Sequence, residues 1–229
     1  QEFVSQMEKV FGKGTLDITH DNFNNCGIRH TLLPDGYSCD QQEYILALKT
    51  IHDPQATGRE KFAEATALLA KLFISLLMAL AYTLMTRLDL APYVHALQRW
   101  AQKPKMEHVR KLNALVKWAQ KHPLKLVYKY MVDTHKLLIF SDSGFRREVD
   151  EEGHVEGRAS KGALFLRTGK YNSEERVHLI DWDSGTVKQV TRSTFTSETL
   201  AGISSVDRGT VLAVTLQEIQ DGPLGADAA

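Results

Sequence analysis

Cysteine is scarce in this chain, and neither sign of charge is in excess. Two cysteines in 229 residues exclude a scaffold held by several disulfides and favour a reducing compartment. Lys and Arg together number 28, as do Asp and Glu, so the net charge predicts neither a nucleic-acid nor a membrane partner. Hydrophobic residues make up 43% and charged residues 24%, which excludes a disordered chain and provides the core of one large domain or two small ones.

Long apolar runs are also rare, with one exception. The 15 residues between Lys71 and Arg87 carry no charge and are mostly apolar. A bilayer span needs about 20 such residues, so a buried core helix explains this stretch better than a membrane span. We therefore expect no membrane partner.

The few prolines divide a helical region in the middle of the chain. Pro92, Pro104 and Pro123 bound segments that are otherwise rich in helix-forming residues. The predicted helices are 61–85, a second one after Pro92 that ends near Arg99, 105–120, and a last one over 193–219.

The region before these helices, residues 1–57, predicts a hairpin and a short helix. Pro34-Asp-Gly is a turn signal, in which Gly36 would supply a positive φ. Asp40 is the expected N-cap of the short helix, with Glu43 three residues later as its capping-box partner.

The region after the helices, residues 133–229, begins with strand patterns. Leu137–Phe140 is a continuous apolar run, which is typical of a central strand. Similar runs stand at 163–166 and 177–180, with turns expected at 151–157 and 183–185. With the helical residues 58–132 in between, the predicted fold class is α+β.

Positive charge is concentrated in one segment. Between Arg99 and Lys129 there are nine Lys or Arg residues and a single acid, Glu107. Helical spacing places Arg110, Lys117 and Lys121 away from an apolar stripe, and Trp and Tyr residues are interleaved. A basic face with aromatic rings suits a phosphate backbone, although most charge runs are solvated surface. The residues expected to contact nucleic acid are Arg99, Lys103, Lys105, Arg110, Lys117, Lys121, Lys188 and Arg192.

Two acids carry the candidate chemistry. Asp142 directly follows the apolar strand, and Glu198 lies in the first turns of the last helix. If that helix crosses the sheet, the two carboxylates can share a divalent cation, as two-metal phosphodiester hydrolysis requires. The alternative is structural, with Asp142 in a turn and Glu198 favoured by the helix dipole.

A zinc site is a weaker alternative. Four potential ligands are close in sequence, namely His20, Cys26, His30 and Cys39. Their gaps do not have the paired spacing that zinc sites usually show. A buried cysteine and surface histidines are the simpler interpretation.

Short motifs around the two acids follow the order found in one protein family. Phe140-Ser-Asp-Ser-Gly-Phe is followed by Trp182, by Lys188-Gln189 and then by Ser193-Thr194 with Glu198. This series resembles the ribonuclease H domain of copia-type LTR retrotransposon polyproteins. In that family an Asp-bearing strand precedes a Trp-Ser-Lys-Gln segment and a helix that begins with Ser-Ser-Thr and carries a Glu.

The upstream sequence extends the resemblance over nearly the whole chain. Leu33-Pro-Asp-Gly-Tyr-Ser-Cys-Asp-Gln-Gln-Glu-Tyr-Ile resembles the end of the reverse transcriptase palm. Thr86-Arg-Leu-Asp-Leu-Ala resembles a step that reads TRPDLA in most members, with Leu88 in place of the proline. The resemblance therefore implies the end of the palm and its junction at 1–57, helical thumb and connection at 58–132, and a ribonuclease H-like β-β-β-α unit at 133–229.

The resemblance also implies an activity and its requirements. Asp142 and Glu198 would be catalytic ligands of Mg²⁺ or Mn²⁺ in an enzyme that cleaves the RNA strand of RNA–DNA hybrids. The expected partners are a hybrid or another duplex and the rest of the Pol polyprotein, in cytoplasmic particles with later nuclear entry.

The family's other catalytic acids fall outside the sequence, so we expect a fragment that is inactive alone. In the family the polymerase aspartates lie before Gln1, and two further ribonuclease H acids lie after Ala229. We also expect residues 134–229 to be marginally stable, because the strand that would pair beside Leu137–Ser141 is missing. The alternative is a degenerate element that binds nucleic acid without cleaving it.

Overall fold

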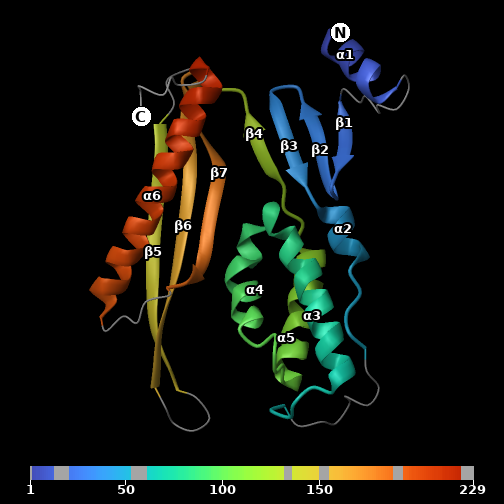
Figure 1. Cartoon of the computed structure of the whole chain (residues 1–229), viewed down its shortest axis with the longest axis vertical. Coiled ribbons are helices and arrows are strands. Elements are labelled where there is room, and N and C mark those ends of the chain that lie inside the picture. The colour runs from blue at the N-terminus through green and yellow to red at the C-terminus, as the bar shows by residue number, and fades with distance from the viewer. Residues whose placement is uncertain are drawn as a thin grey trace.

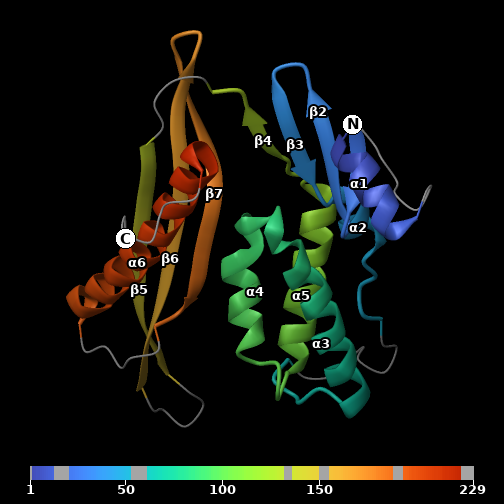
Figure 2. The same cartoon turned by 45° about the horizontal axis from the view of Figure 1, so that its top comes forward.

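The computed structural model describes residues 2–12, 21–52, 61–131, 136–149, 155–187 and 193–222. Within these ranges the chain is a mixed α+β protein with two antiparallel sheets and six α-helices, as the sequence predicts at the level of class. Figure 1 shows a four-stranded sheet above a group of helices and, beside them, a three-stranded sheet covered by one long helix. Figure 2 shows the same two groups after a turn of 45°.

The four-stranded sheet combines the N-terminal region with a strand from beyond the helices. Its strands lie in the order β1 (Asn22–Asn25), β2 (Ile28–Leu33), β3 (Gly36–Asp40) and β4 (Leu126–Lys129). The predicted hairpin joins β2 and β3, with Leu33 opposite Gly36. Gly36 does not have the positive φ that we expected. A Cβ there would lie 2.2 Å from the carbonyl oxygen of Tyr128, so the close approach of β4 is what requires glycine.

Aromatic rings cross one face of this sheet. The successive stacked or tilted neighbours are Phe23, His30, Tyr37 and Tyr128, one on each strand, with ring centroids 4.4, 5.6 and 6.2 Å apart. Such cross-strand pairs stabilise a sheet. The row continues to His178 of β7 (Glu174–Thr186), whose ring lies 5.4 Å from that of Tyr128. The Nε2 atom of His178 accepts a hydrogen bond from the backbone N–H of Lys129 at 2.9 Å, which links the two sheets.

Four helices share one apolar core: α2 (Gln42–Ala47), α3 (Ala67–Tyr82), α4 (Ala91–Gln98) and α5 (Met106–Lys121), with 3-10 turns η2 (Thr83–Met85) and η3 (Leu88–Leu90). A further helix, α1 (Glu2–Phe11), lies apart from this core in Figures 1 and 2. The proline positions thus predicted α4 and α5 well, while α3 begins later than expected, with Thr66 as its N-cap. Phe73, Leu77 and Leu112 are among the fully buried side chains of the core.

The predicted cap of α2 is wrong, because the N-cap is Gln41, whose side chain makes no capping hydrogen bond. Asp40 lies one residue earlier and accepts a hydrogen bond from the backbone N–H of Gln42 at 3.0 Å. Glu43 does not complete a capping box, because it forms an ion pair with Arg29 at 3.1 Å instead. The pair is exposed and contributes little.

The apolar stretch that raised the question of a membrane span is α3 together with η2. By length and composition Ala67–Met85 could cross a bilayer, but 39% of it is buried inside the protein. Leu69, Phe73 and Leu80 point into the core, whereas Leu68 and Met78 are exposed. A core helix passes the same test, so this stretch is weak grounds for a membrane span.

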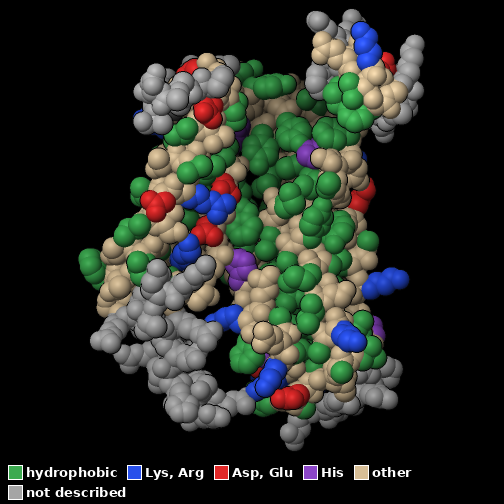
Figure 3. Space-filling view, viewed as in Figure 1, with side chains coloured by type: hydrophobic (Ala, Val, Ile, Leu, Met, Phe, Trp, Pro, Cys, Tyr) green, Lys and Arg blue, Asp and Glu red, His purple; other side chains and the backbone are tan. Residues whose placement is uncertain are grey.

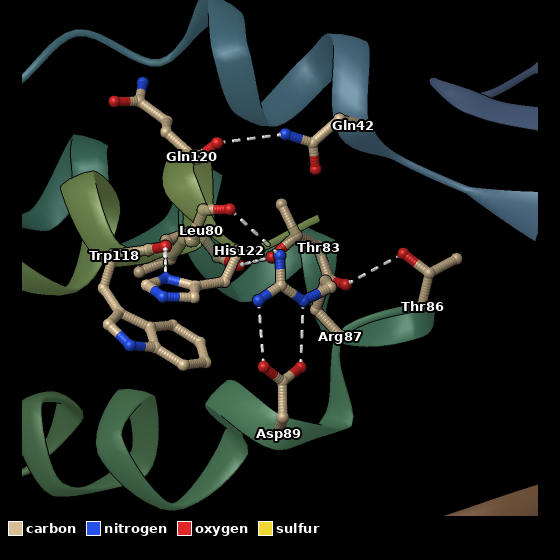
Figure 4. A network of polar contacts seen from close by, with 10 residues as sticks. Gln42, Leu80, Thr83, Thr86, Arg87, Asp89, Trp118, Gln120 and His122 are labelled. Atoms are coloured by element: carbon tan, nitrogen blue, oxygen red, sulfur yellow. Dashed lines mark hydrogen bonds and ion pairs between the residues drawn. The ribbon is translucent and has the colours of Figure 1, made fainter. Parts of the chain in front are cut away.

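A buried arginine joins the connection after α3 to the end of α5 (Figure 4). The guanidinium of Arg87 is 1% exposed and donates two hydrogen bonds of 2.9 Å to the carboxylate of Asp89. It also donates to the carbonyl of Ala119 at 3.2 Å and lies over the ring of Trp118. The Arg and Asp of the Thr86-Arg-Leu-Asp-Leu-Ala motif are therefore a structural pair that fixes the last turn of α5.

The second sheet is an antiparallel meander. β5 (Lys136–Val149), β6 (Val155–Tyr171) and β7 lie in that order, so β5 has one unpaired edge among the described residues. The predicted turn at 183–185 is wrong, because these residues lie inside β7. The turn between β6 and β7 is formed by Asn172 and Ser173, both with positive φ, as a two-residue hairpin loop requires.

The long helix α6 (Thr194–Asp221) covers one face of this sheet. Ser193 caps it by accepting from the backbone N–H of Thr196. Its buried side chains are all small and recur every four residues: Ser197, Ala201, Ser205 and Gly209. This stripe lets the helix approach β5 closely, and a Cβ on Gly209 would lie 2.2 Å from the Cδ1 atom of Ile139.

Candidate nucleic-acid interface and an adjoining cavity

The basic residues of α5 lie on its outer side. Val109, Leu112, Val116 and Ala119 are buried, which confirms the predicted apolar stripe. Arg110, Lys117 and Lys121 are exposed and share the opposite side of the helix, seven and four residues apart. Trp118, on the same helix, is 45% exposed and stacks on His122. This side of α5, which we call the α5 basic face, offers cations and a ring to solvent.

The segment that joins α4 to α5 adds further cations. Arg99 and Lys103 are exposed, and Lys105 is half-buried with its ammonium over the ring of Trp100. Trp100 stacks on His108 with centroids 4.5 Å apart. Lys188 and Arg192, the other two cations expected to contact nucleic acid, lie outside the described residues.

Three other lysines of the basic segment are neutralised by acids. Lys111 pairs with Glu107 at 3.1 Å, Lys125 lies 3.9 Å from Asp40, and Lys129 pairs with Asp35. Burial is the largest single effect and raises the pKa of Glu107, but the hydrogen bond from Lys111 and the positive charges nearby together leave this pKa below its usual value. The hydrogen bond from Lys129 likewise lowers the pKa of Asp35.

The structure brings together the segments that carry Asp142 and Glu198, but directs their side chains apart. The hydroxyl of Ser143 donates to that of Ser197 at 2.8 Å, so β5 and the start of α6 are in contact. Side chains alternate along a strand, and Ser143 faces α6, so Asp142 faces the other side of the sheet. There Asp142 lines a cavity beneath α4. Glu198 is exposed on α6.

A shared cation between these two acids does not fit this arrangement. Among the described residues, no three His, Cys, Asp or Glu side chains lie close enough to hold a metal ion. Of the four residues considered as zinc ligands, Cys26, His30 and Cys39 likewise do not belong to such a group. The fourth, His20, lies outside the described residues.

The cavity that contains Asp142 was not expected from the sequence. It has a volume of about 580 Å³ and lies between α4 and the face of the second sheet that α6 leaves uncovered. From α4 it is lined by residues about one turn apart, Ala91, His95 and Arg99. We call it the α4 cavity. Its residues come from segments that are distant in sequence, so no local motif could have revealed it.

His95 connects the two walls of the α4 cavity. Its Nδ1 atom lies 3.0 Å from the hydroxyl of Ser184, and its ring lies beside that of Trp182. Burial lowers the pKa of His95, although the nearby charge of Asp183 acts in the opposite direction. A neutral imidazole is therefore favoured at neutral pH, and it can hold Ser184 in place.

A second hollow of about 690 Å³ lies between β7 and the elements that face it, namely α3, η2, α4 and β4. Figure 3 shows hydrophobic side chains gathered along this trough. Tyr82, Met85 and Tyr128 line one side, and Leu179 and Trp182 line the other. Polar side chains, among them His95, Asp181 and Arg208, line it as well, so the trough is a mixed seam where the two halves of the molecule meet.

Comparison of the chain with protein-family models, with curated proteins and with solved structures found no match. The structure alone therefore defines the class of protein: an α+β chain with a helical group that presents a basic helix and a β-β-β-α unit beside it.

Proposed function

We propose that the chain is part of a retrotransposon reverse transcriptase–ribonuclease H polyprotein and that it binds an RNA–DNA hybrid or another duplex on the α5 basic face. The observation that carries the proposal is the division of α5, whose stripe of Val109, Leu112, Val116 and Ala119 is buried. Its cations Arg110, Lys117 and Lys121 are all exposed. A row of exposed cations on a rigid helix suits the regular spacing of a phosphate backbone.

The arrangement of the last three strands and α6 supports the family part of the proposal. The resemblance implies three strands followed by a helix, with one acid on the first strand and one at the start of the helix. β5, β6, β7 and α6 have this order, α6 packs on β5, and the contact between Ser143 and Ser197 lies next to the two acids. The unpaired edge of β5 is where the family would add a further strand.

The salt dependence of duplex binding tests the proposal. Arg110→Gln, Lys117→Gln and Lys121→Gln combined should lower the affinity for a short RNA–DNA hybrid and reduce the slope of log K against log salt by about one unit for each lost phosphate contact. Fluorescence anisotropy at several salt concentrations measures both quantities.

A matched variant keeps this test specific. Lys71, Lys136 and Lys170 are exposed lysines away from α5, so their replacement by Gln removes the same charge. Binding should change little in this control. An equal loss of affinity in both triple variants would show that only the overall charge matters, and the proposed interface would be wrong.

Cleavage of RNA is proposed for the full-length parent only. The opposite directions of Asp142 and Glu198 favour the second candidate, a chain that binds nucleic acid without cleaving it. In the parent, Asp142→Asn should abolish Mg²⁺-dependent cleavage of the hybrid while salt-sensitive binding remains. A parent that binds but never cleaves would establish the second candidate.

A further inference from the structure

The floor of the α4 cavity is made of three rows of residues on β5, β6 and β7. In register, the rows are Leu164–Trp182 on β6 and β7, and Asp142–Gly162–Ser184 and Gly144–Ser160–Thr186 across all three strands. The first row is apolar and aromatic, the second offers a carboxylate and a hydroxyl, and the third has only small side chains. The floor therefore changes from apolar to polar within three rows.

Gly162, at the centre of this floor, has no internal reason to be glycine. Its φ is not positive, and a Cβ there would meet only one atom within 4 Å, the carbonyl oxygen of Asp183 at 3.9 Å. Glycine weakens a strand interior, and it often marks a place where a ligand approaches the backbone closely. The missing side chain leaves open the space between Asp142 and Ser184.

The walls of the α4 cavity supply the remaining groups. Arg99 brings a guanidinium to one end of the helix wall, which suits a phosphate. Trp182 and Leu164 offer an apolar surface to a planar ring. Asp142 is exposed within the cavity and can accept hydrogen bonds from a ribose diol, as acids do in other nucleotide sites.

We propose that the α4 cavity binds one nucleotide, with its base against Trp182 and Leu164, its ribose hydroxyls at Asp142 and its phosphate at Arg99. The volume of about 580 Å³ is within the range of ordinary ligand sites. The nucleotide is either free or an unpaired unit of a strand, because both present the same groups. The site does not depend on the α5 basic face.

Binding of adenosine 5′-monophosphate to the purified chain, measured by calorimetry, tests this inference. We expect a dissociation constant below about 1 mM. Gly162→Val should raise it at least about tenfold, because the new side chain fills the floor. Gly202→Val on α6 is the matched control: its Cβ would meet nothing within 4 Å, and Gly202 does not line the cavity, so binding should be unchanged.

Further measurements make the inference independent of how well the valine variants fold. Arg99→Gln and Asp142→Asn replace exposed side chains and should each weaken binding about tenfold, and 2′-deoxyadenosine monophosphate should bind more weakly than the ribonucleotide. Absence of binding, equal binding of ribose 5-phosphate, or full binding by Gly162→Val would each overturn the site.

Two comparisons separate this site from the α5 basic face and identify its source of ligand. The Arg110, Lys117 and Lys121 triple variant should bind the mononucleotide normally, and loss of binding there would place the nucleotide on α5 instead. A short single-stranded oligoadenylate that competes with the mononucleotide would assign the site to a strand. Binding of the mononucleotide without such competition would assign it to the free nucleotide.

Discussion

The two halves of the molecule are held together in different ways. Residues 21–131 surround an apolar cluster that extends from Ile45 to Ala119 and has many fully buried large side chains. In the described part of 136–222, Phe165 is the one large apolar side chain that is fully buried. There the helix and sheet are joined by small side chains and by polar contacts, such as the hydrogen bond of Lys161 with Ser204 and the ion pair of Arg208 with Asp181.

This difference indicates where stability comes from in each half. Burial of large apolar side chains contributes about 2 kcal/mol each, whereas partly exposed ion pairs contribute well under 1 kcal/mol. The second half therefore relies on its strand pairing and on contacts with the first half, namely His178 with Lys129 and His95 with Ser184. We expect the first half to unfold at higher denaturant concentration than the second.

The largest loss of stability is expected when the buried ion pair of Arg87 and Asp89 in the first half is broken. Asp89→Ala leaves the guanidinium of Arg87 buried with its carboxylate partner removed, which should lower the free energy of unfolding of this half by about 3 kcal/mol. Urea denaturation followed by far-UV circular dichroism measures the change.

The surface pair of Glu107 with Lys111 provides the control for this prediction. Lys111 is exposed, so Glu107→Gln should lower the free energy of unfolding by less than about 1 kcal/mol. If the two variants lost the same free energy of unfolding, the buried pair would contribute no more to the stability of the first half than a surface pair does.

A smaller loss of stability, confined to the second half, is expected from the small residues by which α6 packs on β5. The side chain of Gly209→Val would overlap that of Ile139, so α6 must move away from β5, at a cost of about 2 kcal/mol. Faster proteolysis within α6 would report it. Gly202→Ala on the same helix has open space around its Cβ and should not weaken the helix. Equal protease resistance of both variants would contradict the close packing of α6.

The smallest loss of stability is expected in the first half at low pH, through the titration of His108. Burial lowers the pKa of His108 below its usual 6.5, against the opposing charge of Glu107, and its Nδ1 atom accepts from the backbone N–H of Lys105. The unfolded chain therefore binds a proton more readily, so stability is complete above about pH 6.5 and falls as the pH decreases through the folded pKa.

His108→Asn keeps an acceptor at this position but removes the titration, so stability should fall less between pH 7 and pH 5. His95, whose pKa is lowered in the same direction, remains as a background in both proteins. Parallel pH profiles for the variant and the original chain would exclude the contribution of His108.

Local sequence signals predicted much of the helical half and the order of the strands. Prolines and periodicity located α4 and α5, and the change to a helical pattern at Ser193 located the start of α6. The Asn172–Ser173 turn was missed because it stands between two polar stretches, while Asp183-Ser-Gly resembles a turn but is held in β7 by pairing with β6. Tertiary pairing overrides such local preferences.

The two candidate sites also differ in how far the sequence predicts them. The α5 basic face lies on one helix, so spacing alone predicted which of its cations are outside. The α4 cavity joins Arg99, Asp142, Gly162 and Trp182 from four elements, and only the fold brings them together. The direction of Asp142 also depends on the strand register, which a sequence does not show when the paired strands are long and uniform.

The spacing of the small residues on α6 has a consequence for the position of the helix along its own axis. Ser197, Ala201, Ser205 and Gly209 present nearly the same profile to the sheet after a shift of one helical turn, because large side chains that would fit only one set of grooves are missing from this stripe. The observed alignment is therefore selected by directional polar contacts, those of Ser197 with Ser143, Ser204 with Lys161 and Arg208 with Asp181. In α6, shape decides how near the helix lies to the sheet, and hydrogen bonding decides how far along it lies.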